Sequence, residues 1–293
     1  MKKKLSLTIL TVGLAFALPM VSCSSAESSA NSVATGHPSG VRVSCIDVGK
    51  GDCILVQSGV SSALIDVGYK NTANEVLSYL QKQGVTKVDA LVLTHYDRDH
   101  VGGLRPVAKA LGVDKVYLPG YKGADKNYEE TMKTIADLGI SAQPVTQELN
   151  LDLGKAKLTV YPSEVTFVPG VKSDEGNDND VSLVAALTYD KDSYLFAGDL
   201  EEEGIDAYLR GNHGHFDVVK MPHHGVKSDN TEDFLDDVQP KIALVTDSVD
   251  EPAGKKTLKL LDKQCKDVYR TSVDGTIVVE SDGAGNYTVA TGA

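Results

Sequence analysis

The chain has 293 residues, of which 41% are hydrophobic, and it carries a formal net charge of −12 at pH 7. This length and apolar content are enough for a sizeable core in one large domain or two small ones. The absence of tryptophan argues against an aromatic sugar-binding platform, and the acidic balance repels nucleic acid at long range.

Residues 1–22 have the order of an export signal peptide. Three lysines at positions 2–4 precede an apolar stretch at residues 5–18, which is too short to span a membrane comfortably. The segment ends at Cys23 in a context that resembles a bacterial lipobox. We therefore expect lipidation of Cys23, a membrane anchor through that lipid, and a location at the cell surface. Cleavage by ordinary signal peptidase, with release of a secreted protein, is the alternative.

Residues 23–40 are rich in Ser, Ala and Asn and predict a flexible tether. Residues 41–293 show no internal repeat, and we interpret them as one domain. In chain order, strands are predicted at residues 41–47, 53–57, 62–66, 90–94, 115–118, 157–161, 182–189, 193–197, 216–220, 242–245, 275–280 and 287–290. Helices are predicted at residues 74–83, 101–111, 128–138, 201–210 and 257–265.

These strands fall into two batches, each with its own helices. That arrangement favours an α/β (α+β) fold in the form of a four-layer αββα sandwich. Cys45 and Cys53 flank a tight turn at residues 49–51. An export signal permits a disulfide between them, and two unpaired buried cysteines are the alternative.

The stretch that follows the predicted strand at residues 90–94 carries four side chains able to bind metals. They are His95, Asp97, Asp99 and His100. Imidazole and carboxylate groups together suit divalent transition metals. His95 and Asp97 are two apart, so an extended segment projects them to the same side, whereas Asp99 and His100 are adjacent at a turn into a helix. This spacing predicts two metal ions, one for each pair.

Two later predicted strands are also followed by side chains able to bind metals. Asp199 follows an apolar strand and Gly198, and a carboxylate in this place can bridge two cations. His223 and His224 follow the strand at residues 216–220. Adjacent residues at a strand end point to opposite sides, so one of the two histidines is expected to bind metal and the other to contact substrate or donate a proton. With Asp99 they form the predicted catalytic set.

These motifs resemble the metallo-β-lactamase family. The run from His95 to His100 is similar to its His-x-His-x-Asp-His signature, with Asp97 where the second histidine usually stands. Further likenesses occur, in the same order as in the family, at residues 47–52, 63–68, 179–184, 196–201, 220–225 and 274–277. The departure at Asp97 is similar to the extracellular hydrolase domain of the competence DNA-uptake channel ComEC. The resemblance implies the four-layer fold and cleavage of phosphodiesters.

Asn179 and Asp180 occupy the region in which many members of the family supply another histidine. Asp180 is therefore a candidate metal ligand, and an Asx-type loop is the alternative reading of this acidic segment. Oxygen donors in place of imidazoles raise the tolerance for Mn²⁺ over Zn²⁺, so the expected cofactors are two divalent ions, Zn or Mn. Asp47, Asp66, Asn179 and Lys220 are expected to support the ligands.

Other chemistries lack sequence support, since neither a Gly-x-Ser-x-Gly nor a phosphate-binding Gly-x-x-x-x-Gly-Lys motif occurs. We therefore expect an exported metal-dependent phosphodiesterase or nuclease. Its partner would be nucleic acid or a small phosphoester, and no obligate protein partner is implied. The alternatives are hydrolysis of small esters, lactones or phosphocholine-type groups, or a metal-binding module without catalysis. His37, His213 and His215 match no motif and are expected in solvated loops.

Overall fold

The computed structural model describes residues 36–123, 125–169, 177–211 and 213–292, all within one compact unit that spans residues 31–293. The predicted signal peptide, Cys23 and most of the predicted tether lie outside the described residues. Among the described helices, none is both long and apolar enough to cross a membrane.

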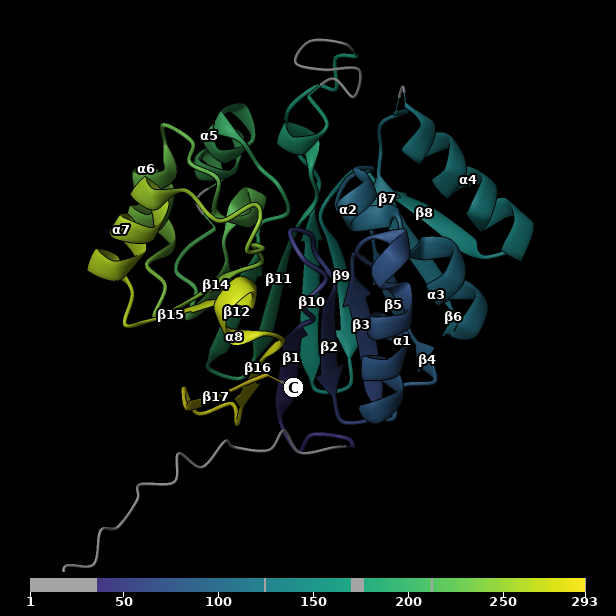
Figure 1. Cartoon of the computed structure of the whole chain (residues 1–293), viewed down its shortest axis with the longest axis horizontal. Helices are drawn as coiled ribbons and strands as arrows, with labels where there is room; N and C mark the ends of the chain where they lie inside the picture. Colours follow the sequence, from purple (N-terminus) through teal and green to yellow (C-terminus); the bar gives the residue numbers. More distant parts are fainter. Residues whose placement is uncertain (1–35, 124, 170–176, 212, 293) are drawn as a thin grey trace, which may run out of the picture. The chain divides into compact units, whose positions relative to one another are not determined.

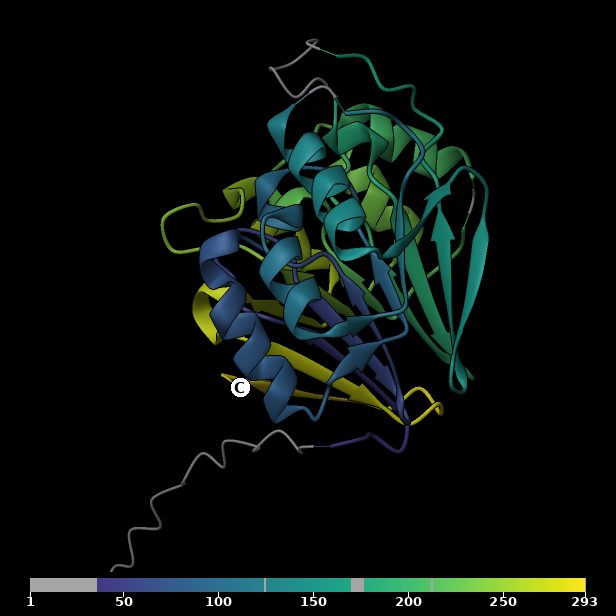
Figure 2. The same ribbon diagram turned by 90° about the vertical axis from the view of Figure 1, so that its right-hand side faces the viewer.

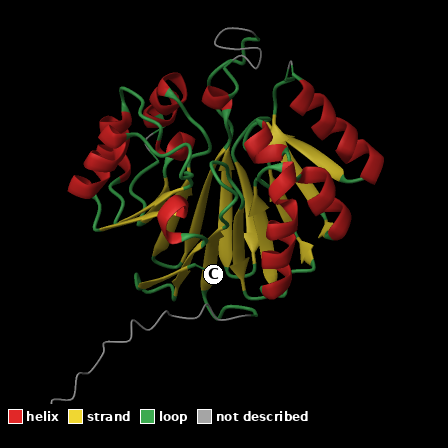
Figure 3. Cartoon of the chain, viewed as in Figure 1, coloured by secondary structure: helices red, strands yellow, loops and turns green. Residues whose placement is uncertain are grey.

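Two large sheets form the centre of this unit (Figures 1 and 3). The first has eight strands in the order β17-β16-β1-β2-β3-β5-β7-β8. Their bounds are Tyr287–Thr291, Ile277–Ser281, Val41–Cys45, Ile54–Ser58, Ser61–Ile65, Ala90–Val92, Lys115–Pro119 and Ser141–Val145. The second has seven strands in the order β15-β14-β13-β12-β11-β10-β9. Their bounds are Asp267–Arg270, Ile242–Val245, Val218–Lys220, Asp192–Phe196, Val184–Tyr189, Ala156–Tyr161 and Leu149–Leu153.

Helices cover the outer face of each sheet, as Figures 1 and 2 show. The first sheet is covered by α1 (Ala73–Lys82), α2 (Arg98–Val101), α3 (Leu104–Ala110) and α4 (Lys126–Leu138). The second is covered by α5 (Glu202–Arg210), α6 (Thr231–Val238) and α7 (Lys255–Gln264). Short elements complete the fold: α8 (Thr271–Asp274), the pair β4 (Lys87–Val88) and β6 (Gly112–Val113), and the 3-10 turns η1 (Lys70–Thr72), η2 (Asn179–Val181) and η3 (Pro222–Gly225). The predicted four-layer αββα sandwich is confirmed.

Three apolar layers hold the sandwich together, and the alternation along each strand decides which layer a side chain enters. Val41, Val43 and Cys45 point between the two sheets. Cys53 and Leu55 point from the neighbouring strand toward the helices. Each fully buried Val or Leu side chain contributes about 1.5–3 kcal/mol to the stability of the fold.

Of the two alternatives for Cys45 and Cys53, the structure has two unpaired buried cysteines. Cys45 pairs in register with Ile54, so Cys53 is one position away and faces the other side of the sheet. Both thiols are free and buried. Their pKa values are raised by burial, that of Cys45 to about 12.

The sequence did not predict β4, β6, β8, β9, β15, α6 or α8. It expected one helix at residues 101–111, where the structure has the last residue of α2 and all of α3. The helical hydrogen bonds are interrupted at Gly103, whose backbone N–H donates to the Gly68 carbonyl at 2.8 Å. Only glycine fits at positions 102 and 103, because both lie close to other backbone atoms. A Cβ atom on Gly102 would lie 2.3 Å from the Arg98 carbonyl oxygen, and one on Gly103 would lie 2.3 Å from that of Val67. The chain therefore makes one turn of α2 that carries Asp99 and His100, and then starts α3.

The candidate site lies where strands of both sheets end. β3 and β5 are parallel in the first sheet, and β12, β13 and β14 are parallel in the second. The residues that follow these strands are Asp66, His95, Asp199, the two histidines at 223 and 224, and Thr246. Because the carboxyl ends of parallel strands meet at one edge, the fold brings side chains from distant motifs into contact.

Candidate metal centre

Four side chains from three segments converge on one small volume. The Nε2 atom of His224 lies 2.9 Å from Oδ2 of Asp199 and 3.4 Å from Oδ2 of Asp99. The Nε2 atom of His100 lies 3.2 Å from Oδ2 of Asp199, 3.9 Å from Oδ2 of Asp99 and 3.4 Å from Nε2 of His224. Donor atoms around one ion with bonds of about 2.0–2.2 Å have separations of this size. Two imidazoles and two carboxylates therefore fit a divalent metal.

The charges in this group are strongly coupled. Burial by itself lowers the pKa of both His100 and His224, but the nearby carboxylate of Asp199 raises it by more. As a result the pKa of His100 is well above its usual range, and that of His224 is about 10. Burial raises the pKa of both Asp199 and Asp99, but contacts with the histidines lower it by more. The pKa of Asp199 is therefore well below its usual range, and that of Asp99 is about 2. Without metal, the group is thus held together by imidazolium–carboxylate contacts.

Asp66 fixes the orientation of His100, as the sequence predicted for a supporting carboxylate. Its Oδ2 atom lies 2.8 Å from Nδ1 of His100, so Nε2 of that ring faces Asp199. The backbone N–H and the hydroxyl of Thr94 also donate to Asp66, at 2.8 and 2.7 Å. Asp66 has a φ of 57°, an uncommon backbone conformation for a residue with a side chain.

The backbone conformation decides which of the two adjacent histidines faces the metal group. His223 and His224 have φ values of 44° and 51°, so they form a left-handed turn within η3 and do not alternate along a strand. His224 is buried, and its Nδ1 lies 3.0 Å from the Thr246 hydroxyl, which leaves Nε2 facing the metal group. The structure therefore places His224, and not His223, among the four converging side chains.

His223 lies at the mouth of the site. Its Nδ1 is 3.4 Å from Oε1 of Glu201, which also accepts a hydrogen bond from the amide of Asn179 at 3.0 Å. Burial lowers the pKa of His223. Asn179, which was expected to support a metal ligand, supports this rim carboxylate.

Asp199 is held by a buried lysine. Lys220 Nζ donates to Asp199 Oδ1 at 3.3 Å and to the Gly198 carbonyl at 3.0 Å, and it forms an ion pair with Asp52. Gly198 is required before Asp199, since its φ is +54° and a Cβ atom there would lie 2.8 Å from that of Ser182. Because Oδ1 of Asp199 faces Lys220, only Oδ2 faces the histidines.

Asp52 was not predicted from the sequence as a site residue. It lies within the same group, its oxygen being within 4.8 Å of potential ligand atoms of His100, Asp199 and His224. Both of its oxygens have other partners, however: Oδ2 pairs with Lys220, and Oδ1 accepts from the Thr246 hydroxyl at 2.7 Å. Asp52 therefore positions Lys220 and Thr246, and the motif at residues 47–52 was the signal that could have identified it.

His95 and Asp97 lie beside this group, and the ring of His95 is 4.1 Å from that of His100 between centroids. Nε2 of His95 and Oδ1 of Asp97 are buried, and neither has a hydrogen-bond partner in the part of the chain that the structure describes. Two adjacent desolvated donor atoms without partners also fit a cation.

Two predicted site residues lie elsewhere. Asp180 is buried, and its Oδ1 accepts a hydrogen bond at 2.9 Å from the backbone N–H of Gly204, in the first turn of α5. This carboxylate supports a helix N-terminus, where its negative charge is favoured. Asp47 is exposed and closes its own turn by accepting from the N–H of Gly49 at 3.1 Å. The structure brings neither carboxylate to a histidine of the group.

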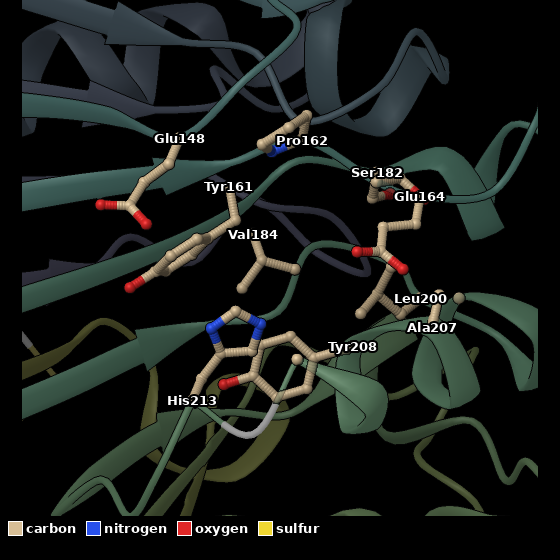
Figure 4. A pocket seen from close by; sticks show the side chains of 13 residues that line it. Glu148, Tyr161, Pro162, Glu164, Ser182, Val184, Leu200, Ala207, Tyr208 and His213 are labelled. Carbon is tan, nitrogen blue, oxygen red and sulfur yellow. The ribbon is translucent and has the colours of Figure 1, made fainter.

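A separate cavity of about 230 Å³ lies between β10, β11 and α5 (Figure 4). The imidazole of His213 lies between the rings of Tyr161 and Tyr208, with centroid distances of 4.5 and 4.6 Å. His213 is therefore half-buried and not in a solvated loop. Ser182 also lines the cavity, and its hydroxyl accepts from the N–H of Asp199 at 3.2 Å. None of the four converging metal-site side chains lines this cavity.

Known proteins resemble this chain in sequence. ComE operon protein 3 of Bacillus subtilis is 27% identical over 266 residues, a match that covers 80% of this chain and 32% of that protein. Recombination protein 2 of Haemophilus influenzae is 26% identical over 242 residues, covering 81% and 28%. Competence protein ComA of Neisseria gonorrhoeae is 27% identical over 204 residues, covering 68% and 26%. The chain thus spans about a third or less of the length of these ComEC-like competence proteins.

Solved structures resemble it in fold. The metallo-β-lactamase fold protein YhfI from Bacillus subtilis superposes with a TM-score of 0.54 and 12% identity, covering 81% of this chain and 99% of that one. CmlA, a diiron β-hydroxylase from Streptomyces venezuelae, superposes with a TM-score of 0.50 and 14% identity, covering 79% and 53%. The sequence model described as Metallo-beta-lactamase superfamily matches residues 46–246. With this match, the four-layer fold and the converging histidines and carboxylates, the chain belongs to the metallo-β-lactamase superfamily.

Proposed function

We propose that this protein is an exported, metal-dependent phosphodiesterase that cleaves DNA. One observation carries the metal-dependent part: the Nε2 atoms of His100 and His224 each lie 2.9–3.9 Å from carboxylate oxygens of Asp99 and Asp199, at the ends of strands from both sheets. Asp99 and His223, with side chains 17% and 20% exposed, open this group to solvent. The metal group therefore has contact with solvent at its edge.

Each residue of the site has its own role in the proposed hydrolysis. When bound, divalent ions would activate water and stabilise charge on the leaving oxygen. His100 and His224 present Nε2 because Asp66 and Thr246 engage their Nδ1 atoms. Lys220 keeps Asp199 in place and balances its charge with that of Asp52.

His223 is the proposed proton carrier at the mouth. Its lowered pKa, caused by burial, favours the neutral imidazole near pH 7. Glu201 faces one ring nitrogen at 3.4 Å. The ring can therefore give or take a proton at the substrate while Glu201 stabilises the charged form.

DNA as the substrate is supported by two of the relatives, whose names refer to recombination and to competence. The rim of the site adds a local argument. Lys50 lies close enough to His223 to lower its pKa, and Arg98 lies over the ring of Tyr69 at 5.8 Å, next to Asp99. Cations and an aromatic face beside a metal group suit the phosphates and bases of a single strand.

The net charge of −12 favours a second candidate, a hydrolase of small esters, lactones or phosphocholine-type groups. Such substrates do not experience the long-range repulsion that a polyanion meets. A metal-binding module without catalysis is the remaining alternative, and a turnover assay on protein of known metal content excludes or establishes it.

The deciding experiment compares substrates on the full-length chain. Purified protein loaded with Zn²⁺ or Mn²⁺ is assayed on single-stranded DNA, bis-p-nitrophenyl phosphate, a lactone and a β-lactam. We expect turnover of both phosphodiesters and its loss in Asp199→Ala. Hydrolysis of the lactone or β-lactam without any phosphodiester cleavage would reject the proposed substrate class. The variant Lys50→Gln separates the two phosphodiesters, because it should raise KM for DNA and leave the small substrate unaffected.

A further inference from the structure

The cavity between β10, β11 and α5 lies apart from the metal centre and has a different chemistry. Its volume is about 230 Å³. Ligand sites typically measure about 300–1,000 Å³, so this cavity suits a small molecule. Among the described residues that line it, none is a lysine or an arginine. The cavity therefore offers no cation to an anionic ligand.

The inner wall of the cavity is apolar. Val184 of β11, Leu200 and Ala207 of α5 line it, and all three are buried. The Ser182 hydroxyl also lines the cavity, but it already accepts a hydrogen bond from the backbone N–H of Asp199 at 3.2 Å. An alkyl group placed here leaves water and contacts other apolar groups, which is favourable.

Two carboxylates lie at the mouth of the cavity. Glu148 and Glu164 are exposed, and Figure 4 shows their side chains on opposite sides of Val184. Burial lowers the pKa of His213 below its usual range, although the charges of Asp237, Glu148 and Glu164 act in the opposite direction. The imidazole is therefore neutral near pH 7 and does not balance these carboxylates, so the mouth carries negative charge.

Aromatic rings form a third part of the lining. His213 lies between Tyr161 and Tyr208, with ring centroids 4.5 and 4.6 Å away, and all three residues line the cavity. Because the imidazole already fills the gap between the two tyrosine rings, a second planar ring such as a nucleobase does not fit there. The electron-rich faces of tyrosine rings do attract ammonium ions that come within about 6 Å.

We propose that this cavity binds a small organic cation, with an ammonium group between the carboxylates of Glu148 and Glu164 and an alkyl group against the apolar inner wall. The carboxylates and the tyrosine rings select the positive charge, and the inner wall selects the alkyl group. This ligand is separate from the substrate of the proposed function, because none of the four converging metal-site side chains lines the cavity.

The test uses three probes that share one branched alkyl group and differ in charge: 3-methylbutylammonium, 3-methylbutan-1-ol and 3-methylbutanoate. Each is titrated into the isotopically labelled full-length chain, once after dialysis against EDTA and once with Zn²⁺. Chemical shifts of the backbone amides give both the affinity and the location of binding. With and without Zn²⁺, we expect the ammonium ion to shift amides near Tyr161 and Tyr208 and to bind about tenfold more tightly than the alcohol or the carboxylate.

Variants assign the binding to the cavity. Glu148→Gln and Glu164→Gln remove one charge each from exposed positions, so the fold is retained and affinity for the ammonium ion should fall by about two- to fivefold. Tyr161→Leu removes an aromatic face and should have an effect of about the same size. Ala207→Leu fills the apolar interior and should abolish binding while both carboxylates remain. Glu203→Gln is the matched control, since it removes an exposed carboxylate on α5 that does not line the cavity.

The proposal is overturned if the ammonium ion does not bind, or if the alcohol binds as tightly, which would make the cavity simply apolar. Equal weakening by Glu203→Gln and by the two cavity variants Glu148→Gln and Glu164→Gln would also overturn it, because the ion would then be attracted to the acidic surface in general. The proposed function is tested by turnover and fails separately if no phosphodiester is cleaved.

Discussion

Oδ2 of Asp66 lies 2.8 Å from Nδ1 of His100, and both side chains are fully buried. The same carboxylate accepts from the backbone N–H of Thr94, the residue just before His95. One carboxylate thus links the orientation of His100 to the end of the strand that carries His95. This link explains why Asp66 keeps an uncommon positive φ: its position serves two histidines.

The substitutions Asp66→Asn and Asp199→Ala should have different effects on metal binding. The asparagine keeps the shape but loses the charge that orients His100, so metal affinity or rate should fall by about 10–100-fold with the ion still bound. Asp199→Ala removes an atom 2.9 Å from Nε2 of His224 and 3.2 Å from Nε2 of His100, and should lose bound metal and activity together. Measurements of metal content and turnover on both folded variants test whether Asp199→Ala has the larger effect. Near-normal metal and rate in Asp199→Ala would show that the centre lies elsewhere.

Metal removal should abolish activity and leave the fold in place. The donor atoms follow strands of two sheets whose apolar layers do not include them. After dialysis against EDTA, circular dichroism in the far ultraviolet should therefore change little at room temperature, although the melting temperature falls because the native state loses a ligand. Unfolding of the metal-free chain at room temperature would make the ions structural.

Lys220→Met should destabilise the metal-free chain strongly. The substitution leaves the carboxylates of Asp52 and Asp199 buried without their lysine, and breaking a buried ion pair in this way costs about 3–5 kcal/mol. Urea unfolding without metal measures the change in free energy. Lys241→Met, which removes an ion pair with Asp217 from a half-exposed lysine, is the control and should cost about 1 kcal/mol or less. Equal effects of the two substitutions would contradict the role of Lys220.

Asp247 should make stability depend on pH in the acid range. Burial raises the pKa of its carboxyl group, but Arg270, the N–H of Ala253 and the Ser272 hydroxyl outweigh burial and lower the pKa below the usual 3.8. A lowered pKa in the folded state stabilises the protein above pH 3.8, and that stability is lost as the pH falls through the folded value.

Asp247→Asn should therefore be less stable than the wild-type chain by about 1–3 kcal/mol at pH 7. The difference should shrink as the pH falls through the lowered pKa, which lies below 3.8. Urea unfolding at a series of pH values measures it. Asp114→Asn, at an exposed ion pair with Lys87, is the control and should show little dependence. A difference that stays constant down to the lowest pH would mean that the charge of Asp247 is not what stabilises the loop.

Cys23→Ser tests the predicted anchor, which lies outside the described residues. If Cys23 carries lipid, the variant should leave the membrane fraction or accumulate unprocessed, as judged by fractionation and by the apparent mass of the chain. Fractionation identical to that of the wild-type chain would support release by ordinary signal peptidase.

The fold class and most of the candidate site could be predicted from the order of motifs along the chain. Strand periodicity and helix boundaries predicted the two-batch order of the sandwich, and the motif residues His95, Asp97, Asp99, His100 and Asp199 do lie together at the strand ends. Local patterns were sufficient because each motif directly follows a strand whose apolar residues fix its direction.

The contacts among those residues depend on how the two sheets and their loops pack in three dimensions. The positive φ values at His223 and His224, which select His224, arise from a turn that no periodicity reveals. Asp52 enters the site from a turn far away in the chain, through its contacts with Lys220 and Thr246. Asp180 is withdrawn to the N-terminus of α5. Such pairings depend on packing between distant segments. Asp52 and Thr246 are 194 residues apart, and Asp66 and His100 are 34 apart, so spacing along the chain does not encode these contacts.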